Sequence, residues 1–360
     1  MKIEKKEYLK WRSPRFGVSN PEKVESKVYE WLFTSKLNGY CSNEDMNGPS
    51  SFDVGPAFSF DRFGQSETEL PDGRKVYIAG EHEDSYDPDF YIYNDIVVEF
   101  EGSYDFYLYP KEVFRPTDFH SSTIVGENII CIGNLGYYDE RQYRHTQVYM
   151  INTNNFHITE IQTTGELSGW IHSHRAVLSK DGQKIHISEG LIDKGEGGAF
   201  YQNYDEWELD LKTWSWRRIT EKNYTQKEIV RSDGASLCLG ELRHLALMSD
   251  IDLDNKFLIN EQKRQEKDVQ KKSGKKPDLN LLSSIYNFGK LIEPTDENDD
   301  EYGVYRVEFN KVIIKFTEKI DNVIMVVEGE LETVQIKELE AHVQATMGEI
   351  EGVPCLMRDL

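Results

Sequence analysis

The order of apolar and polar positions in residues 60–100 predicts strands joined by a turn and a long polar loop. Residues 75–80 (KVYIAG) and residues 93–100 (YNDIVVEF) are rich in β-branched and aromatic side chains, which is typical of buried strands. The PDG turn at residues 71–73 favours a tight reversal, because proline presets φ and glycine accepts a positive φ. We therefore expect a mainly β fold.

This arrangement recurs twice along the chain. Gln65, His120 and His174 occupy equivalent places, 55 and 54 residues apart. Each is followed by an apolar strand, a strand beyond a polar loop, and an aromatic segment. The apolar strands cover residues 75–80, 129–133 and 184–188, the next strands 93–100, 146–152 and 205–211, and the aromatic segments 104–107, 156–158 and 214–219. About four strands in fifty-odd residues is typical of one propeller blade.

The repeat resembles the kelch repeat over about residues 59–220. The segments that match the first strand of that motif are His120-Ser121-Ser122 and His174-Arg175-Ala176-Val177. Later positions of the motif are matched by Asn94-Asp95, Trp214 and Trp216. The family's glycine pair is reduced to Gly80-Glu81, Gly133-Asn134 and Glu189-Gly190, and its Trp is replaced by Phe106 and Phe156. The resemblance implies a kelch-like β-propeller.

Three units do not close a ring, because propellers usually have at least four blades. We therefore expect an incomplete propeller, capped by helices or completed by a second copy of the chain. Its open sides need a cover against strand addition, which the lead-in at 1–58, residues 221–260 or the C-terminal strands could supply. Residues 224–240 fit two strands of a degenerate fourth blade, and residues 241–251 fit a covering helix equally well.

A helix is predicted in the lead-in. The segment SNPE at residues 19–22 has a capping side chain, then proline at the first helical position, then an acid near the positive end of the dipole. Val24, Val28, Trp31 and Leu32 follow at helical spacing. We expect this helix to end near Leu37 and residues 40–58 to form a loop.

The C-terminal part is predicted to be a charged connector, residues 261–301, followed by a small α+β unit, residues 302–360. The connector is a solvated helix or mobile segment with a second acidic stretch at residues 293–301. The unit contains three apolar strands, a helix over residues 334–347 capped by Thr333, and a short last strand. The propeller region is thereby expected to span residues 59–260.

Charge limits the choice of partner. The chain has 360 residues, a formal charge of -22 and a pI near 4.9. Nucleic acids and anionic membranes attract Lys and Arg, so both are disfavoured. A basic protein partner is favoured over them, although solubility alone also explains an acidic surface.

Cysteine usage and the N-terminus favour the cytoplasm. Cys41, Cys131, Cys238 and Cys355 lie far apart with no CxxC pair, which fits reduced thiols better than a disulfide framework or a zinc site. The N-terminus lacks an apolar signal core, and no apolar run approaches the roughly twenty residues of a membrane helix.

The repeated polar position supplies the candidates for a central channel. These are Gln65, His120, His174 and the neighbouring Arg175. Because Gln65 cannot act as a general base, the position favours a structural role over a catalytic one. We expect no catalytic residue.

The acidic loop at residues 81–89 is the main candidate for a partner contact. Its carboxylates could bind Ca²⁺ or remain solvated, but it lacks the spacing of a dedicated calcium loop. Nearby aromatic residues favour an interface. The predicted contact residues are His82, Asp84, Asp87, Asp89, Tyr91, Tyr137 and Tyr138.

Other motifs carry less weight. His172 and His174 share one strand face, but zinc needs a third ligand that the sequence does not identify. The GEGG segment at residues 195–198 lacks the lysine and strand-to-helix context of a phosphate loop. No Gly-x-Ser-x-Gly or HExxH motif occurs. We expect neither a metal nor a cofactor.

These patterns favour a non-catalytic interaction module, such as an immunity- or antitoxin-like protein or an adaptor, that binds a basic partner through propeller loops. A kelch-type sugar isomerase or mutarotase using His120 with Glu81 or Arg175 is the alternative. A third hypothesis makes the C-terminal unit the functional part. A homo-oligomer fits the open propeller edges.

Overall fold

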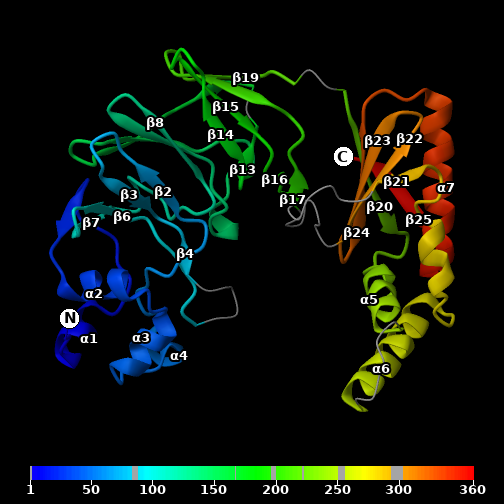
Figure 1. Cartoon of the computed structure of the whole chain (residues 1–360), viewed down its shortest axis with the longest axis horizontal. Helices are drawn as coiled ribbons and strands as arrows, with labels where there is room; N and C mark the ends of the chain where they lie inside the picture. Colours follow the sequence, from blue (N-terminus) through cyan, green and yellow to red (C-terminus); the bar gives the residue numbers. More distant parts are fainter. Residues whose placement is uncertain are drawn as a thin grey trace. The chain divides into compact units, whose positions relative to one another are not determined.

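The computed structural model describes residues 2–82, 88–166, 168–195, 200–220, 223–249, 256–292 and 303–360. The chain divides into two compact units, residues 1–220 and residues 221–360 (Figure 1). Each unit has apolar clusters of its own. The division differs from the predicted boundaries at 58, 260 and 301, because side-chain packing joins segments that composition alone separates.

The first unit contains three four-stranded antiparallel meanders of the same strand order; β1 adds to the first in antiparallel orientation, and β12 adds to the third in parallel orientation. Their orders are β1-β7-β6-β3-β2, β11-β10-β9-β8 and β12-β19-β18-β15-β14. The first comprises β1 (Glu22–Val24), β2 (Ser66–Glu69), β3 (Lys75–Ile78), β6 (Ile96–Phe100) and β7 (Ser103–Leu108). The second comprises β8 (Ser121–Val125), β9 (Asn128–Ile132), β10 (Val148–Asn152) and β11 (Ile158–Glu160). The third comprises β12 (Thr164–Gly165), β14 (Arg175–Leu178), β15 (Lys184–Ser188), β18 (Trp207–Asp210) and β19 (Ser215–Arg218).

Shorter elements connect the meanders. The small sheets are β4 (Glu81–His82) with β5 (Tyr91–Ile92), and β13 (Trp170–His172) with β16 (Leu191–Asp193) and β17 (Phe200–Gln202). The helices are α1 (Lys5–Trp11), α2 (Lys27–Ser35), α3 (Gly39–Asp45), α4 (Ser51–Val54) and the 3₁₀ turn η1 (Tyr138–Glu140). The fold is thus mainly β, as predicted, and none of the described sheets closes on itself.

The first strands of the three meanders lie next to one another, with β8 between β2 and β14. The residues just before them are linked through the backbone: Phe119 N donates to Gly64 O at 2.9 Å, and Ser173 N donates to Phe119 O at 2.7 Å. All three residues have positive φ, at 62°, 49° and 53° for Gly64, Phe119 and Ser173. The predicted 55- and 54-residue recurrence is therefore a real structural repeat.

Apolar layers fill the spaces between meanders. Alternating residues point to opposite faces of a strand, so each sheet offers two faces. Val76, Ile78, Ile129 and Cys131 belong to the layer between the first and second meanders. The layer between the second and third contains Ile130, Ile132, Ile185, Ile187, Trp207 and Trp216. Each sheet thereby shields its neighbour, as the repeat predicts.

The lead-in covers the outer face of the first meander. Tyr29, Leu32 and Phe33 of α2 pack with Val97 and Phe106 of β6 and β7 (Figure 1). This confirms one of the predicted covers.

The lead-in helix starts later than predicted. Residues Glu22–Val24 pair as β1 with β7, and α2 begins at Lys27 with Ser26 as its N-cap. Residues 40–58, expected as a loop, contain α4 and most of α3. Asn38 is the N-cap of α3 and Ser50 is the N-cap of α4, so these two residues provide the local signal for the short helices.

The outer face of the third meander is polar. Val177, His186, Glu208 and Arg217 stand in one cross-strand row. Glu208 accepts hydrogen bonds from Lys184 and Arg217, both at 2.9 Å, and its Oε2 lies 3.3 Å from His186 Nε2. A charged face cannot form another apolar layer, so this side of the array has the polar surface typical of a terminal repeat.

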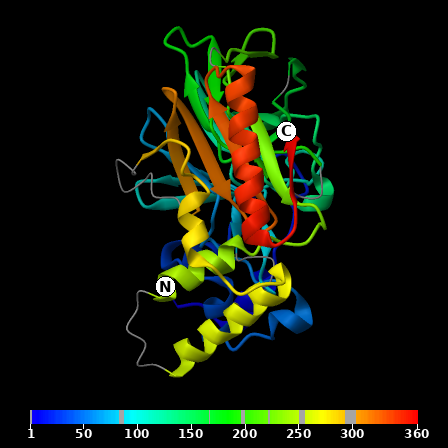
Figure 2. The same cartoon turned by 90° about the vertical axis from the view of Figure 1, so that its right-hand side faces the viewer.

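The second unit is a six-stranded antiparallel sheet of order β21-β22-β23-β24-β20-β25. Its strands are β20 (Thr225–Arg231), β21 (Lys290–Ile292), β22 (Val304–Phe309), β23 (Val312–Glu318), β24 (Asn322–Glu328) and β25 (Cys355–Asp359). Its helices are α5 (Leu239–Ser249), α6 (Lys256–Ser273), η2 (Leu279–Ser284) and α7 (Thr333–Glu351). Figure 2 shows α7 lying across the sheet, consistent with the burial of Leu339, Val343 and Met347 in its core.

Three expectations about this region are corrected. Strand β20 pairs with β24 and β25, so residues 224–240 do not supply a fourth blade. The charged connector begins with a helix, α6, which is one of its two predicted forms, but this helix buries Val269 in the core of the second unit and is not fully solvated. The N-cap of α7 is Glu332, which forms a capping box with Gln335, and Thr333 is the first helical residue. The stretch at 293–301 lies outside the described residues.

A buried ion pair joins β20 to the end of α7. Arg231 Nη1 lies 2.9 Å from Glu351 Oε2, and the two side chains are 2% and 0% exposed. The same carboxylate accepts from the backbone N of Cys238 at 2.8 Å. Arg231 also donates to the carbonyl of Lys272 near the end of α6. The pair thus connects β20, the end of α7, the segment at Cys238 and the end of α6.

Replacement of Glu351 by Ala is expected to destabilise the second unit by about 1–3 kcal/mol, because it leaves the buried N–H of Cys238 and one side of the Arg231 guanidinium without their acceptor. Asp233 still pairs with the other side of this guanidinium at 2.8 Å. All six Trp residues lie in residues 1–220, so Trp fluorescence reports only the first unit. We expect the helical circular-dichroism transition to shift to lower urea while the Trp transition stays in place. An unchanged helical transition would contradict this role of the pair.

Candidate functional site

The predicted channel residues form part of the repeat's framework. His120 Nε2 forms a 2.8 Å hydrogen bond with Ser66 Oγ, and His174 Nε2 forms one of 2.8 Å with Ser121 Oγ. Each histidine therefore binds the serine of the preceding meander. Gln65 has no preceding meander within the described residues and donates to Ala79 O at 3.0 Å. This explains why the repeat tolerates glutamine at its first position.

Burial keeps these histidines neutral. Desolvation lowers the pKa of His120 to about 4, and it lowers that of His174 to about 3 with help from the two neighbouring histidines. The pKa of His172 is lowered to about 4, again mainly by burial. These values lie too far below neutral pH for general acid–base catalysis, which favours a pKa near the working pH.

Arg175 lies on the opposite face of β14 from its neighbours in the apolar layer. Ala176 and Leu178 pack toward the second meander, whereas Arg175 and Val177 are exposed. Arg175 and His120 are thus not brought together, so the form of the sugar-isomerase alternative that uses Arg175 gains no support from this geometry. The form that uses His120 with Glu81 stays a prediction.

Two of the predicted contact residues are buried instead. His82 is 2% exposed, with Nδ1 2.6 Å from Asp61 O and Nε2 accepting from Gly39 N at 2.9 Å. Asp89 is 1% exposed and accepts from Ser51 Oγ at 2.5 Å and Ala57 N at 2.6 Å. Both side chains fix the lead-in against the first meander, so neither can anchor a partner directly.

The predicted tyrosines differ in accessibility. Tyr91 and Tyr137 are half-buried, and the hydroxyl of Tyr137 accepts from Ile92 N at 2.9 Å. Tyr138 is 56% exposed and stays available to a partner. Asp84 and Asp87 lie outside the described residues.

No metal site emerges within the described ranges. They contain no group of three or more His, Cys, Asp or Glu placed to hold a metal ion. Nor do they include a helix with the length and apolar character needed to cross a membrane.

The structure reveals an acidic cavity of about 610 Å³ that the sequence did not identify. Helix α3, helix α4 and the segment between them form most of its wall, and Pro88 and Asp89 complete it. Tyr40 and Phe52 stand at its rim and are 58% and 84% exposed. Both rings are therefore accessible from solvent.

A buried polar network forms the base of this acidic cavity. Arg12 is 3% exposed and donates to Asn43 Oδ1 at 3.0 Å and to Ser51 Oγ at 3.1 Å. Ser51 in turn donates to Asp89. The network fixes α3 and α4 beneath the rim, so the cavity is preformed.

The rim of the acidic cavity carries negative charge. Glu44 and Asp45 are exposed, and Tyr40 donates to Glu44 at 2.8 Å. Among the described residues the lining contains no Lys or Arg, although Lys5 contacts the carbonyl of Asn47 at its edge. Carboxylates beside accessible aromatic faces suit a cationic side chain.

Sequence reasoning missed these residues because they lie in a segment predicted as loop. The available signals were the caps before each short helix and the aromatic residues Tyr40 and Phe52 among polar neighbours. Only the fold brings the segment next to Asp89.

Comparison with known proteins does not assign a family. No protein-family model matches the chain, and no curated protein matches it. The resemblance to kelch repeats therefore rests on the residues quoted above.

The buried histidines predict a pH dependence of the first unit. Their folded pKa values lie below the ordinary 6.5, so the unfolded chain binds protons first as pH falls. Stability is then fully present above pH 6.5 and lost toward pH 4, by roughly 3 kcal/mol for a fully buried histidine. Asp118, whose pKa is raised by burial, acts in the opposite direction.

The measurement is the urea midpoint of the Trp transition between pH 7 and pH 4. Compared with wild type, the double variant His120→Gln/His174→Gln should start less stable and lose less stability over this range. His157→Gln, an exposed histidine, is the control. Equal pH slopes for wild type and double variant would refute the assignment.

Proposed function

We propose that the chain is a non-catalytic interaction module whose first unit binds a basic protein partner. The observation that carries this proposal is the acidic cavity rimmed by Tyr40 and Phe52. A Lys or Arg side chain of the partner would lie against these rings, near Glu44 and Asp45.

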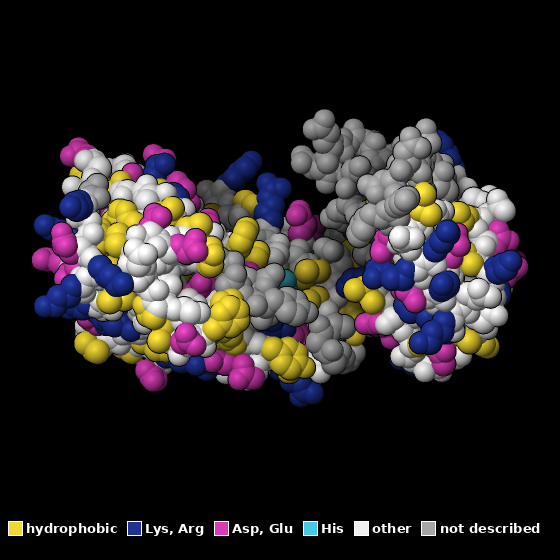
Figure 3. All heavy atoms as spheres, turned by 90° about the horizontal axis from the view of Figure 1, so that it is seen from below, with side chains coloured by type: hydrophobic (Ala, Val, Ile, Leu, Met, Phe, Trp, Pro, Cys, Tyr) yellow, Lys and Arg dark blue, Asp and Glu magenta, His cyan; other side chains and the backbone are white. Residues whose placement is uncertain are grey.

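The charge of the surrounding segment supports this choice. Residues 51–110 contain 14 Asp and Glu but only 3 Lys and Arg. Figure 3 shows exposed hydrophobic side chains lying among charged side chains of both signs on one face of the first unit. An excess of one sign speeds the approach of an oppositely charged protein, and exposed apolar groups then hold it.

The role of the meanders in this proposal is that of a rigid support. We propose that they are three blades of an incomplete kelch-like propeller, which the shared strand order, the adjacent first strands and the histidine–serine bonds support. An immunity- or antitoxin-like protein or an adaptor fits such a support. A cytoplasmic location belongs to the same proposal, and the four free cysteines are compatible with it.

The test uses a fluorescently labelled Arg/Lys-rich peptide and measures anisotropy with the full chain. Phe52→Ala and Glu44→Gln should each weaken binding by about tenfold, because one removes the aromatic face and the other a charge. Wild-type affinity should fall steadily as salt rises.

Matched controls are Phe100→Ala and Glu101→Gln, which alter an exposed aromatic and an exposed acid at the β6–β7 turn. Native purification of the chain with its partner, followed by a mass measurement of the complex, extends the test to the protein. Equal losses in test and control variants would show only general charge attraction and would reject the cavity as the site.

A further inference from the structure

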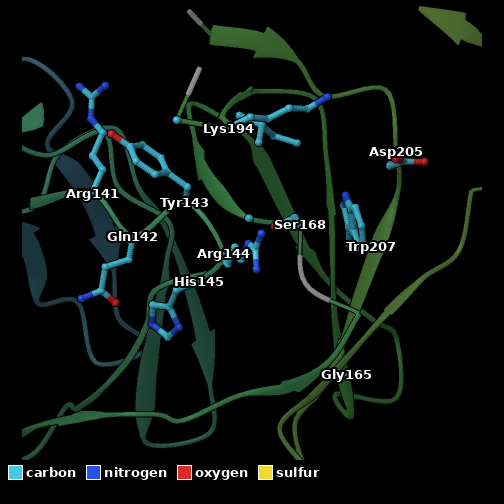
Figure 4. A pocket seen from close by; sticks show the side chains of 13 residues that line it. Arg141, Gln142, Tyr143, Arg144, His145, Gly165, Ser168, Lys194, Asp205 and Trp207 are labelled. Carbon is cyan, nitrogen blue, oxygen red and sulfur yellow. The ribbon is translucent and has the colours of Figure 1, made fainter. Parts of the chain in front are cut away.

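A second cavity, of about 1150 Å³, lies in the first unit near the third meander. We call it the basic cavity. The loop before β10, the segment between β12 and β13, and residues of β16 and β18 form its walls. Figure 4 shows Arg144 between His145 and Lys194, with Asp205 and Trp207 on the other side.

One buried carboxylate holds two of these walls together. Asp193 is fully buried; its Oδ2 accepts from Arg141 Nη1 at 2.8 Å and its Oδ1 accepts from Gly195 N at 2.8 Å. Arg141 also donates to the carbonyl oxygens of Leu135 at 2.9 Å and Gly136 at 3.2 Å. The basic cavity is therefore fixed before any ligand arrives, which lowers the entropic cost of binding.

Close packing between Gly195 and Tyr143 fixes a further wall of the basic cavity. Gly195 has φ +81°, and a Cβ there would lie 2.6 Å from the ring of Tyr143. Only glycine lets the backbone just after β16 approach this ring so closely. Tyr143 is thereby held at the cavity wall.

The charges of the lining are unevenly compensated. Arg141 is neutralised by Asp193, and Asp205 is engaged by Thr220 and by Arg218 at 3.6 Å. Across the residues that the structure describes, Arg144 forms no hydrogen bond or ion pair, and Lys194 contacts only the ring of Tyr201, at 4.6 Å. Among the described residues, these two exposed cations thus have no carboxylate partner, in a chain of charge -22.

A neutral histidine lies beside them. Burial lowers the pKa of His145 and so favours its neutral form. Its Nε2 is buried and has no hydrogen-bond partner within the described residues. This atom has almost no accessible surface, so His145 contributes a ring to the cavity wall and no accessible donor or acceptor at Nε2.

We propose that the basic cavity binds a small organic anion and holds its phosphate or carboxylate group with Arg144 and Lys194. The guanidinium of Arg144 presents parallel donors that match either group, and the ammonium of Lys194 adds a second positive charge. An acidic protein repels anions at long range, so uncompensated cations inside a preformed concave site are the feature that selects one. This site is separate from the acidic cavity and does not depend on a protein partner.

The test is isothermal titration of the full chain at low salt with four probes: glucose 6-phosphate, glucuronate, inorganic phosphate and uncharged glucose. At least one anion should bind with a dissociation constant below about 1 mM, and glucose should not bind. The phosphate and carboxylate probes then identify which group the cavity takes.

The variants Arg144→Gln and Lys194→Gln should each weaken that binding by about tenfold. Both residues are exposed, so the variants should keep the wild-type melting temperature without ligand. Lys180→Gln and Lys212→Gln remove exposed cations that do not line the cavity and should change affinity less than twofold.

Three results would overturn the proposal. These are no binding of any anion below about 10 mM, undiminished affinity in the double variant Arg144→Gln/Lys194→Gln, and an equal loss in the control variants. The last would mean that charge attracts the anion without a site.

Discussion

The hydrogen bond between a buried histidine and the serine of the preceding meander is the interaction on which the first unit depends. His120 binds Ser66 and His174 binds Ser121, each at 2.8 Å. A backbone bond beside each pair fixes the same strands through residues of positive φ. A buried neutral ring without its hydrogen-bond partner costs free energy. A change in the spacing of the repeats would break these bonds, so the bonds constrain the spacing.

The same constraint explains how the array begins and ends. Gln65 occupies the histidine position where no earlier serine is available, and α2 covers the outer apolar face. On the outer face of the third meander, Glu208 accepts hydrogen bonds from Lys184 and Arg217. This face is therefore charged and needs no further sheet to cover it. Apolar layers hold the meanders together. Helix α2 covers the outer face at one end, and a charged outer face forms the other end. An array with such ends does not need to close into a ring.

The net charge of -22 does not show that the first unit has local regions of opposite charge. The acidic cavity presents Glu44 and Asp45 beside Phe52, whereas the basic cavity presents Arg144, which has no carboxylate partner in the part of the chain that the structure describes. Two preformed cavities of opposite character on one unit suit ligands of opposite charge. The second unit is held by a different device, the buried Arg231 pair, so its stability is not tied to the histidine framework.

The sequence by itself determined the mainly β character, the three repeats and most strand positions of the first unit, because alternation and recurrence are local properties of the chain. It did not determine which side chains are accessible: His82 and Asp89 looked like loop contacts and are buried. It also could not place residues 225–231 in the second sheet, since an apolar strand pairs equally well with several partners until the core selects one. Both cavities combine segments far apart in sequence, so only the tertiary structure decided their position and charge.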